Sequence, residues 1–421
     1  EPALDANTSR IDLVRSPLRS WLAVVAVMTG IFMIVTAEIL PIGLLIPIAS
    51  TFAVSDGTAG LMMMVPGFVA AAAAPALTVC TARIDRRVML CAWIAALAAS
   101  NFLCAFANHY WMVLVSRVVV GLVIGGFWSI GAALGGRLVP DRHGARATSI
   151  IFVAVPLGSV LGVPVGTFLA DAMGWRSAFV MLGAGTLAVL VALAVLMPAL
   201  PAVHVTRLAV LRDLLRITDV RIGLLATFLV VLAHFGTYTY VTPLLEQVTQ
   251  IGLGLIGALL LVYGAAGIVG NFVAGFTVNR WLRLSFGVAA SSIGGATLLL
   301  PIVGQWVWAT TALLVVWGVA YGAVPACSQA WISRPAPNAT EAATVLFTSV
   351  FQATIGIGAL TGGIVVDRTS AGTVMVCGSV VAILGACLIF GLGRPPSHSL
   401  NPATAKQSPQ VSMSARTGSR R

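Results

Sequence analysis

The sequence predicts an all-α integral membrane protein whose twelve transmembrane helices form two pseudo-symmetric six-helix bundles. Composition is the first reason: 59% of the residues are hydrophobic and 9% are charged, whereas soluble domains contain about a quarter charged residues. The second is a series of apolar runs long enough to cross a bilayer as helices. Spanning segments must satisfy their own backbone hydrogen bonds, so these runs are expected to be helical. The third reason, an internal repeat, divides the runs into two sets.

The apolar runs follow one another along most of the chain, six in each half. We expect helices at 22–47, 57–80, 88–107, 112–136, 147–170, 177–197, 222–245, 253–278, 285–303, 306–332, 342–366 and 371–393.

An offset of 196 residues relates the two halves. Glu38 corresponds to His234, so each half has an ionisable side chain at one equivalent position of an apolar run. The other matches are Pro47 with Pro243, Gly126 with Gly322, Gly162 with Gly358, Gly166 with Gly362 and Asp171 with Asp367, and, with one residue of slippage, Arg83, Arg86 and Arg137 with Arg280, Arg283 and Arg334. Many transporters are built from such repeats, with polar sites at the repeat interface.

The chain divides at its one long interior connection. Leucines and arginines alternate there, which predicts a basic amphipathic helix on the membrane surface. The segment after 393 is rich in Pro, Ser and Thr and is expected to be disordered. The predicted parts are a cytoplasmic tail (1–21), a first six-helix bundle (22–197), a cytoplasmic linker (198–221), a second six-helix bundle (222–393) and a cytoplasmic tail (394–421).

The net charge of +11 lies mainly on one side of the predicted membrane domain. Of the 24 Lys and Arg residues, 21 fall in the two tails and in the loops that share their side. Positive residues mark the cytoplasmic side, so both termini are expected in the cytoplasm. Such a surface favours anionic lipid, and a nucleic-acid partner is not needed to explain it. The six cysteines show no metal-ligand spacing, and we expect no metal site.

Several predicted helices contain small residues four apart. They are Gly121 and Gly125, then Gly158, Gly162 and Gly166, and later Gly358 and Gly362. This spacing lets helix backbones approach closely, either as ordinary membrane packing or as the seams of bundles that move against one another. Pro164 is expected to bend its helix.

Glu38 and Arg117 are the only acid and the only Arg or Lys placed inside predicted spans. By helical rise they lie roughly 13 Å and 8–10 Å from the outer surface, so an ion pair is geometrically possible. A static salt bridge between two helices is one interpretation. The favoured one is proton coupling, since intramembrane charge is usually functional. Arg117 stays charged, so Glu38 would carry the proton.

His234 lies near the middle of the seventh predicted span, with Tyr238 one turn further on the same face. Histidine titrates near neutral pH, so a proton-coupling role is possible. A hydrogen-bonded packing residue is the alternative. We favour a role in a cavity because His234 is equivalent to Glu38.

Trp128, Gln329 and Gln352 are the other candidates for ligand contact. Trp128 follows Arg117 by about three helical turns and points the same way. Gln352 lies near mid-membrane, where a buried amide needs a partner. With Tyr238, these residues would suit a flat, polar, neutral ligand such as a nucleoside, a sugar or a planar drug. Trp331 and Tyr240 are interpreted as interfacial anchors.

Four segments resemble motifs of the major facilitator superfamily, in its drug:proton antiporter branch. They are the first span from Ala37-Glu38-Ile39-Leu40-Pro41 to Pro47, the loop Arg83-Ile84-Asp85-Arg86-Arg87, the fourth span from Arg117 through Gly121, Gly125 and Gly126, and the fifth span with Gly158, Gly162, Pro164 and Gly166. The fourth-span motif is linked to proton transfer in that branch. The resemblance implies two bundles around a central cavity and transport by alternating access.

A finer resemblance is to bacterial efflux transporters of purine ribonucleosides, at 38–41, 125–129, 137–140 and 324–332. Around His234 and Tyr238, arabinose-type sugar efflux transporters are also similar. This implies an inner-membrane proton antiporter that exports a small polar metabolite, foremost purine ribonucleosides. It implies no cofactor beyond the proton gradient, and we expect a monomer. The alternatives are sugar or drug efflux, proton-symport uptake, or a non-transporting membrane sensor. An enzyme is not expected, because no nucleophile with its base, metal cluster or phosphate loop is apparent.

Overall fold

The computed structural model describes residues 17–80, 84–128, 135–200, 212–335 and 339–392. Regular structure in these ranges is helical and includes no strand. The helices are α2 (Pro17–Gly43), α3 (Leu45–Phe52), α4 (Asp56–Ala59), α5 (Leu61–Cys80), α6 (Arg86–Ala105), α7 (Tyr110–Trp128), α8 (Gly135–Leu138), α9 (Asp141–Met173), α10 (Trp175–Leu196), α12 (Thr218–Tyr238), α13 (Val241–Gln247), α14 (Leu253–Val303), α15 (Val307–Ser333), α16 (Thr340–Arg368) and α17 (Ala371–Leu392).

Each predicted span falls on these helices, and eleven helices of the described chain are long and apolar enough to cross a membrane. One of the eleven, α14, has 51 residues, or roughly 76 Å at 1.5 Å per residue. That length is more than twice the thickness of the hydrocarbon core. A kink at Trp281, with φ −132° and ψ 44°, separates two helices within it. The eighth and ninth predicted spans are these two parts, and the predicted fold class is confirmed.

The first helix of each half breaks at an equivalent residue, which the sequence analysis missed. Leu44 has φ −108° and ψ 7°, and Tyr240, 196 positions later, has φ −109° and ψ 19°. Pro47 and Pro243 each follow the break by three residues. A proline has no N–H for the carbonyl four residues earlier, and its ring clashes with that carbonyl. Hence 22–47 and 222–245 are each two helices instead of one.

Glycines set the distance between the same pair of helices in both halves. A Cβ on Gly162 of α9 would lie 3.2 Å from the Cα of Thr36 on α2. A Cβ on Gly358 of α16 would lie 3.2 Å from the carbonyl oxygen of Leu232 on α12. Both residues of the first pair map onto the second at the offset of 196. The duplication therefore extends to individual contacts.

The repeat holds at the neighbouring glycines as well. A Cβ on Gly166 would meet Leu40, and a Cβ on Gly362 would meet Gly236, again the equivalent pair. Gly158, one turn before Gly162, approaches Val35 in the same way. In the N-terminal half, Gly121 and Gly125 bring α7 onto α5, where added Cβ atoms would lie 2.7 Å from neighbouring atoms of α5.

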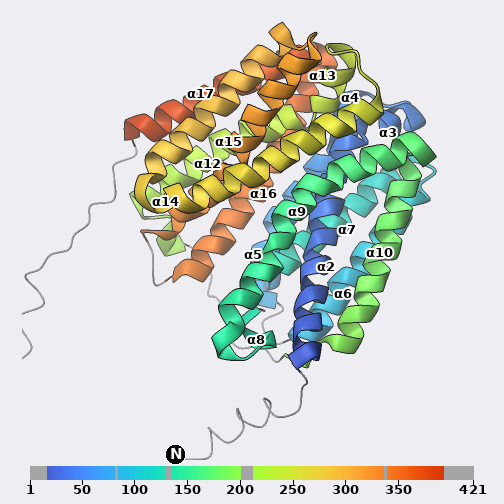
Figure 1. The fold of residues 1–421 in the computed structure, drawn as a ribbon, viewed down its shortest axis with the longest axis vertical. Helices are drawn as coiled ribbons and strands as arrows, with labels where there is room; N and C mark the ends of the chain where they lie inside the picture. The colour runs from blue at the N-terminus through green and yellow to red at the C-terminus, as the bar shows by residue number, and fades with distance from the viewer. Residues whose placement is uncertain (1–16, 81–83, 129–134, 201–211, 336–338, 393–421) are drawn as a thin grey trace, which may run out of the picture.

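The two groups of helices, α2 to α10 and α12 to α17, meet at the end that carries α3, α4 and α13 and diverge toward the end that carries α8 (Figure 1). At the closed end, Asp367 of α16 accepts hydrogen bonds from Ser55 Oγ, at 2.7 Å, and from the Gly57 N–H, at 2.8 Å. Thr242 Oγ1 donates to the carbonyl of Ile42 across the same boundary, at 2.9 Å.

Two predicted anchors at the membrane surface are buried instead. Tyr240 is fully buried, and its hydroxyl donates to the Ala359 carbonyl at 2.6 Å. Trp331 is 8% exposed and packs against Gly223. The interfacial interpretation is therefore wrong for both. Both rings fill spaces between helices that glycines leave open.

Some predictions fall outside the described residues: most of the amphipathic linker helix, Arg83, most of both tails, and the end of the fourth predicted span at 129–134. Of the loop motif after α5, Asp85 is described. Its Oδ1 accepts a hydrogen bond from the Arg87 N–H at 2.7 Å, so it caps the start of α6.

Candidate functional site

Glu38 and Gln352 meet at the boundary between the two helix groups. Gln352 Nε2 of α16 donates a 2.9 Å hydrogen bond to Glu38 Oε1 of α2. Gln352 is 5% exposed, and Glu38 is partly buried. The contact joins residues 314 positions apart. It brings together two of the residues that the sequence singled out and gives the buried amide its expected partner.

Arg117 bonds to the backbone beside Glu38 and not to the Glu38 carboxylate. Its Nη1 donates to the Ala37 carbonyl at 2.8 Å and its Nε to Ser116 Oγ at 3.3 Å. The guanidinium carbon lies 5.4 Å from the centre of the Phe179 ring. The ion pair of Glu38 with Arg117 that their depths made possible is absent from the described chain, where Glu38 bonds to Gln352 instead.

A cluster of rings surrounds His234 in the C-terminal half. Trp317 Nε1 donates to His234 Nδ1 at 3.0 Å, so Nδ1 is an acceptor and the neutral imidazole carries its proton on Nε2. The Tyr321 ring stacks on the imidazole with 3.4 Å between centroids and 7° between planes. Tyr238 stacks at 5.1 Å and 19°. The predicted neighbours His234 and Tyr238 therefore do lie face to face.

Tyr263 completes this group. Its ring lies 4.6 Å from that of Tyr238, and its hydroxyl is buried without a hydrogen-bond partner. We define the aromatic cluster as His234, Tyr238, Tyr263, Trp317 and Tyr321. The cluster lies next to the part of α16 that carries Gln352, because the Phe235 ring lies 5.8 Å from that of Tyr321 and 6.3 Å from that of Phe351.

Tyr263, Trp317 and Tyr321 were not among the residues predicted from the sequence. Comparison of the halves could have found them: at the offset of 196 they correspond to Gly67, Gly121 and Gly125. In the N-terminal half these glycines let helices touch, and a Cβ on Gly67 would lie 2.7 Å from backbone atoms of α16. Large rings take the place of these glycines in the C-terminal half, so the two halves differ at these three positions.

One predicted ligand residue, Gln329, is not part of this group. Gln329 is exposed near the end of α15, where its Nε2 lies 3.4 Å from Thr344 Oγ1. Trp128 is the last residue of α7, and its side chain lies outside the described part of the chain. A ligand role for Trp128 stays a prediction.

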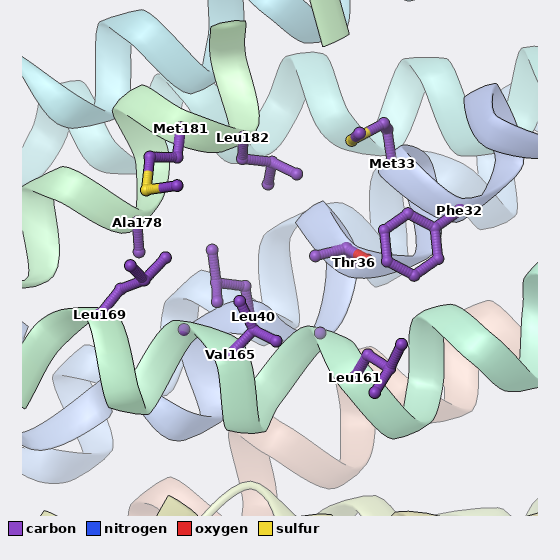
Figure 2. Close-up of a pocket in the computed structure, with 12 residues that line it drawn as sticks. Phe32, Met33, Thr36, Leu40, Leu161, Val165, Leu169, Ala178, Met181 and Leu182 are labelled. Atoms are coloured by element: carbon purple, nitrogen blue, oxygen red, sulfur yellow. The ribbon is translucent and has the colours of Figure 1, made fainter. Parts of the chain in front are cut away.

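A separate apolar pocket lies between α2, α9 and α10 (Figure 2). It encloses about 160 Å³ and is bounded by Leu40, Leu161, Val165, Met181 and similar side chains. Thr36 is the one polar side chain in its lining. Val165 is 50% and Met181 53% exposed, so the pocket adjoins an apolar outer surface. Such a lining suits hydrocarbon and offers nothing to orient a polar ligand.

Comparison with known proteins shows the family. The model of the Major Facilitator Superfamily matches residues 21–359. A protein of Pseudomonas aeruginosa named transcription regulatory protein OpdE is 31% identical over 89% of this chain and 94% of its own length. The purine ribonucleoside efflux pump NepI of Salmonella paratyphi A is 31% identical over 86% of this chain and 91% of its own length.

Solved structures agree on the fold. A bacterial homologue of the human lysosomal transporter Spinster, in an inward-facing and occupied conformation, matches with a TM-score of 0.69 and 17% identity. The match covers 89% of this chain and 97% of that one. The human organic anion transporter MFSD10 matches with a TM-score of 0.63. Since the family model spans most of the twelve predicted helices, the chain belongs to the major facilitator superfamily.

Proposed function

We propose that this protein is a proton-coupled antiporter that exports purine ribonucleosides by alternating access. The observation that carries the proposal is the aromatic cluster beside the Glu38–Gln352 pair at the boundary between the halves. Relatives named as purine ribonucleoside efflux pumps, at 29–31% identity, support the cargo class.

The cluster suits a planar base. Bases stack on aromatic side chains with little dependence on sequence, because every base has a π-face. Tyr321 and Tyr238 offer ring faces with hydroxyls at their edges, and an amide or hydroxyl can bond to the polar edge of a purine. A sugar can lie on one ring face but gains less from several parallel rings.

Glu38 is proposed to carry the proton. It is an acid within a predicted span that bonds across the boundary of the halves, and it is partly exposed, so water can reach it. Proton release to the cytoplasm would precede cargo binding, and proton uptake from outside would accompany the return. Arg117 acts as a positioning residue that fixes the backbone at Ala37.

His234 is proposed to orient the cluster instead of carrying the proton. Its Nδ1 accepts the Trp317 hydrogen bond, and a proton on Nδ1 would break that bond because imidazolium has no acceptor. This assignment differs from the proton-coupling role expected from the sequence.

The proposed setting is a bacterial inner membrane with both termini in the cytoplasm, supported by the 21 of 24 basic residues on that side. In this orientation the structure is closed toward the outside, at α3, α4 and α13, and diverges toward the cytoplasm. The protein is proposed to act as a monomer, in contact with anionic lipid, without a cofactor.

Inverted membrane vesicles test the proposal. With an acidic lumen, vesicles that contain the protein should accumulate labelled inosine or adenosine, and a protonophore should abolish the accumulation. Vesicles with the Glu38→Gln variant are the control. Accumulation of arabinose but not of nucleosides would identify sugars as the cargo. Accumulation that is independent of the proton gradient would refute antiport.

A further inference from the structure

Gln352 was expected to contact cargo, but its side chain bonds to Glu38. Its Nε2 donates to Glu38 Oε1 at 2.9 Å across the boundary of the helix groups. Its Oε1 is buried and has no hydrogen-bond donor. A buried polar atom without a partner is unusual and calls for an explanation.

The side-chain amide is suited to a partner that gains and loses a proton. An ionised carboxylate only accepts hydrogen bonds, and Nε2 serves it. A protonated carboxyl has an O–H to donate, and an amide oxygen can accept it. Half a turn about the last torsion of Gln352 exchanges Nε2 and Oε1 at nearly the same positions. The same contact can therefore serve both forms of Glu38, which neither an apolar nor a cationic side chain could do.

Building on the proposed function, we propose that Gln352 is a coupling residue whose amide stays bonded to Glu38 in both protonation states and so keeps the two halves joined while the proton leaves. The proton passes from the Glu38 carboxyl to water, and the amide then turns Nε2 toward the carboxylate. Without this link, Glu38 could exchange protons in a molecule whose halves are not tied together, and protons would leak without cargo.

In the described chain, the other groups around Glu38 do not bond to both the ionised and the protonated form of its carboxyl. Arg117 of α7 is bonded to the Ala37 carbonyl and stays charged. Tyr321 of α15, whose ring is stacked on His234 of α12, makes no hydrogen bond with Glu38 among the described residues. The packed helix α9 meets α2 through Gly158, Gly162 and Gly166, which carry no side-chain donor or acceptor.

Infrared difference spectroscopy on purified protein in lipid, without cargo, tests the inference directly. The band of a protonated buried carboxyl should disappear in Glu38→Gln, which assigns it. In Gln352→Met, which keeps the length of the side chain, that band should move to the higher wavenumber of a carboxyl without an amide partner. Its titration midpoint should rise by about one pH unit, a tenfold change in proton affinity, because bonds to the charged form are the stronger ones.

Gln305→Leu, a glutamine change at an exposed loop position, is the matched control and should leave the band unchanged. Gln352→Leu is the second variant, in case Gln352→Met is poorly folded. If band and midpoint stay at their wild-type values in the Gln352 variants, the inference is wrong. This readout needs no cargo, so it is independent of whether nucleosides are transported.

Proteoliposomes give the functional readout. Gln352→Met should leak protons without cargo, at a rate above that of wild type, because Glu38 would exchange its proton without a bond that ties the two halves together. If nucleoside exchange stays tightly coupled in this variant, the inference fails while the proposed function stands. If the band shift and the leak occur but no nucleoside is moved, the cargo assignment fails and the role of Gln352 stands.

Discussion

At the scale of single residues, one position has two chemistries in the two halves. Glu38 and His234 are equivalent at the repeat offset, yet Glu38 reaches across to Gln352, whereas His234 is enclosed by rings of its own half. The carboxyl is thus placed where a proton can affect both halves, and the imidazole is placed where it can shape a binding surface.

Glu38→Gln should abolish proton-driven transport while cargo binding stays within about threefold of wild type. An amide of the same shape can still bond to Gln352 but cannot release a proton. Equilibrium binding in detergent and transport in vesicles separate the two effects. Normal gradient-driven export by this variant would exclude Glu38 as the proton carrier.

Tyr321→Ala should weaken purine nucleoside binding by about 1–3 kcal/mol, the usual effect of losing a stacking ring. Tyr321→Phe keeps the ring and should lose little. Isothermal titration of both variants measures the difference. Equal losses in Phe and Ala would mean that the hydroxyl, and not the ring face, contacts cargo.

At the scale of helices, hydropathy was sufficient to locate the spans, because each run must be long and apolar enough to cross the bilayer. It missed the breaks at Leu44 and Tyr240, which depend on one proline three residues later. It also placed Tyr240 and Trp331 at the membrane surface, because a sequence does not show which glycine on another helix makes room for a ring.

Only part of the site could be predicted from the sequence, because a sequence does not show which side chains meet when helices pack. Glu38, His234 and Gln352 stand out as ionisable or amide side chains in apolar runs. Tyr263, Trp317 and Tyr321 look like ordinary membrane aromatics, and their proximity to His234 arises only when α12, α14 and α15 pack together.

Gly358→Ala should destabilise the protein by about 1–3 kcal/mol. Its Cβ would lie 2.9 Å from the Gly236 nitrogen, in the seam between α16 and α12. Gly275→Ala is the matched control, since no atom lies within 4 Å of its added Cβ, and it should be neutral or slightly stabilising. Thermal unfolding in detergent compares them, and equal melting temperatures would show that the seam tolerates a methyl group.

At the scale of the whole molecule, one end is closed by polar contacts between the halves. Asp367 bonds to Ser55 and Gly57, and its repeat equivalent Asp171 approaches Gly254 in the same way, where an added Cβ would lie 3.1 Å from the Asp171 carboxylate. Among the described residues, Asp367 accepts hydrogen bonds across the boundary and Asp171 does not, so we expect Asp367 to hold this end closed.

Asp367→Ala should shift the population toward opening at that end, because Ser55 and Gly57 lose their acceptor. Met173 and Gln247 are exposed on opposite helix groups. The distance between spin labels at these two positions can be measured by pulsed electron paramagnetic resonance. The variant should gain a longer-distance component, and Asp171→Ala should gain less. Identical distance distributions in wild type and Asp367→Ala would show that Asp367 does not hold this end closed.

Proton antiport through Glu38 fixes the direction in which protons move during cargo exchange, and this direction can be measured. Proteoliposomes with a pH-sensitive dye inside and a purine ribonucleoside added outside should show protons leaving as cargo enters, and Glu38→Gln should show no cargo-dependent proton movement. Protons that enter together with the nucleoside, or nucleoside uptake with no proton movement in wild type, would contradict proton antiport through Glu38.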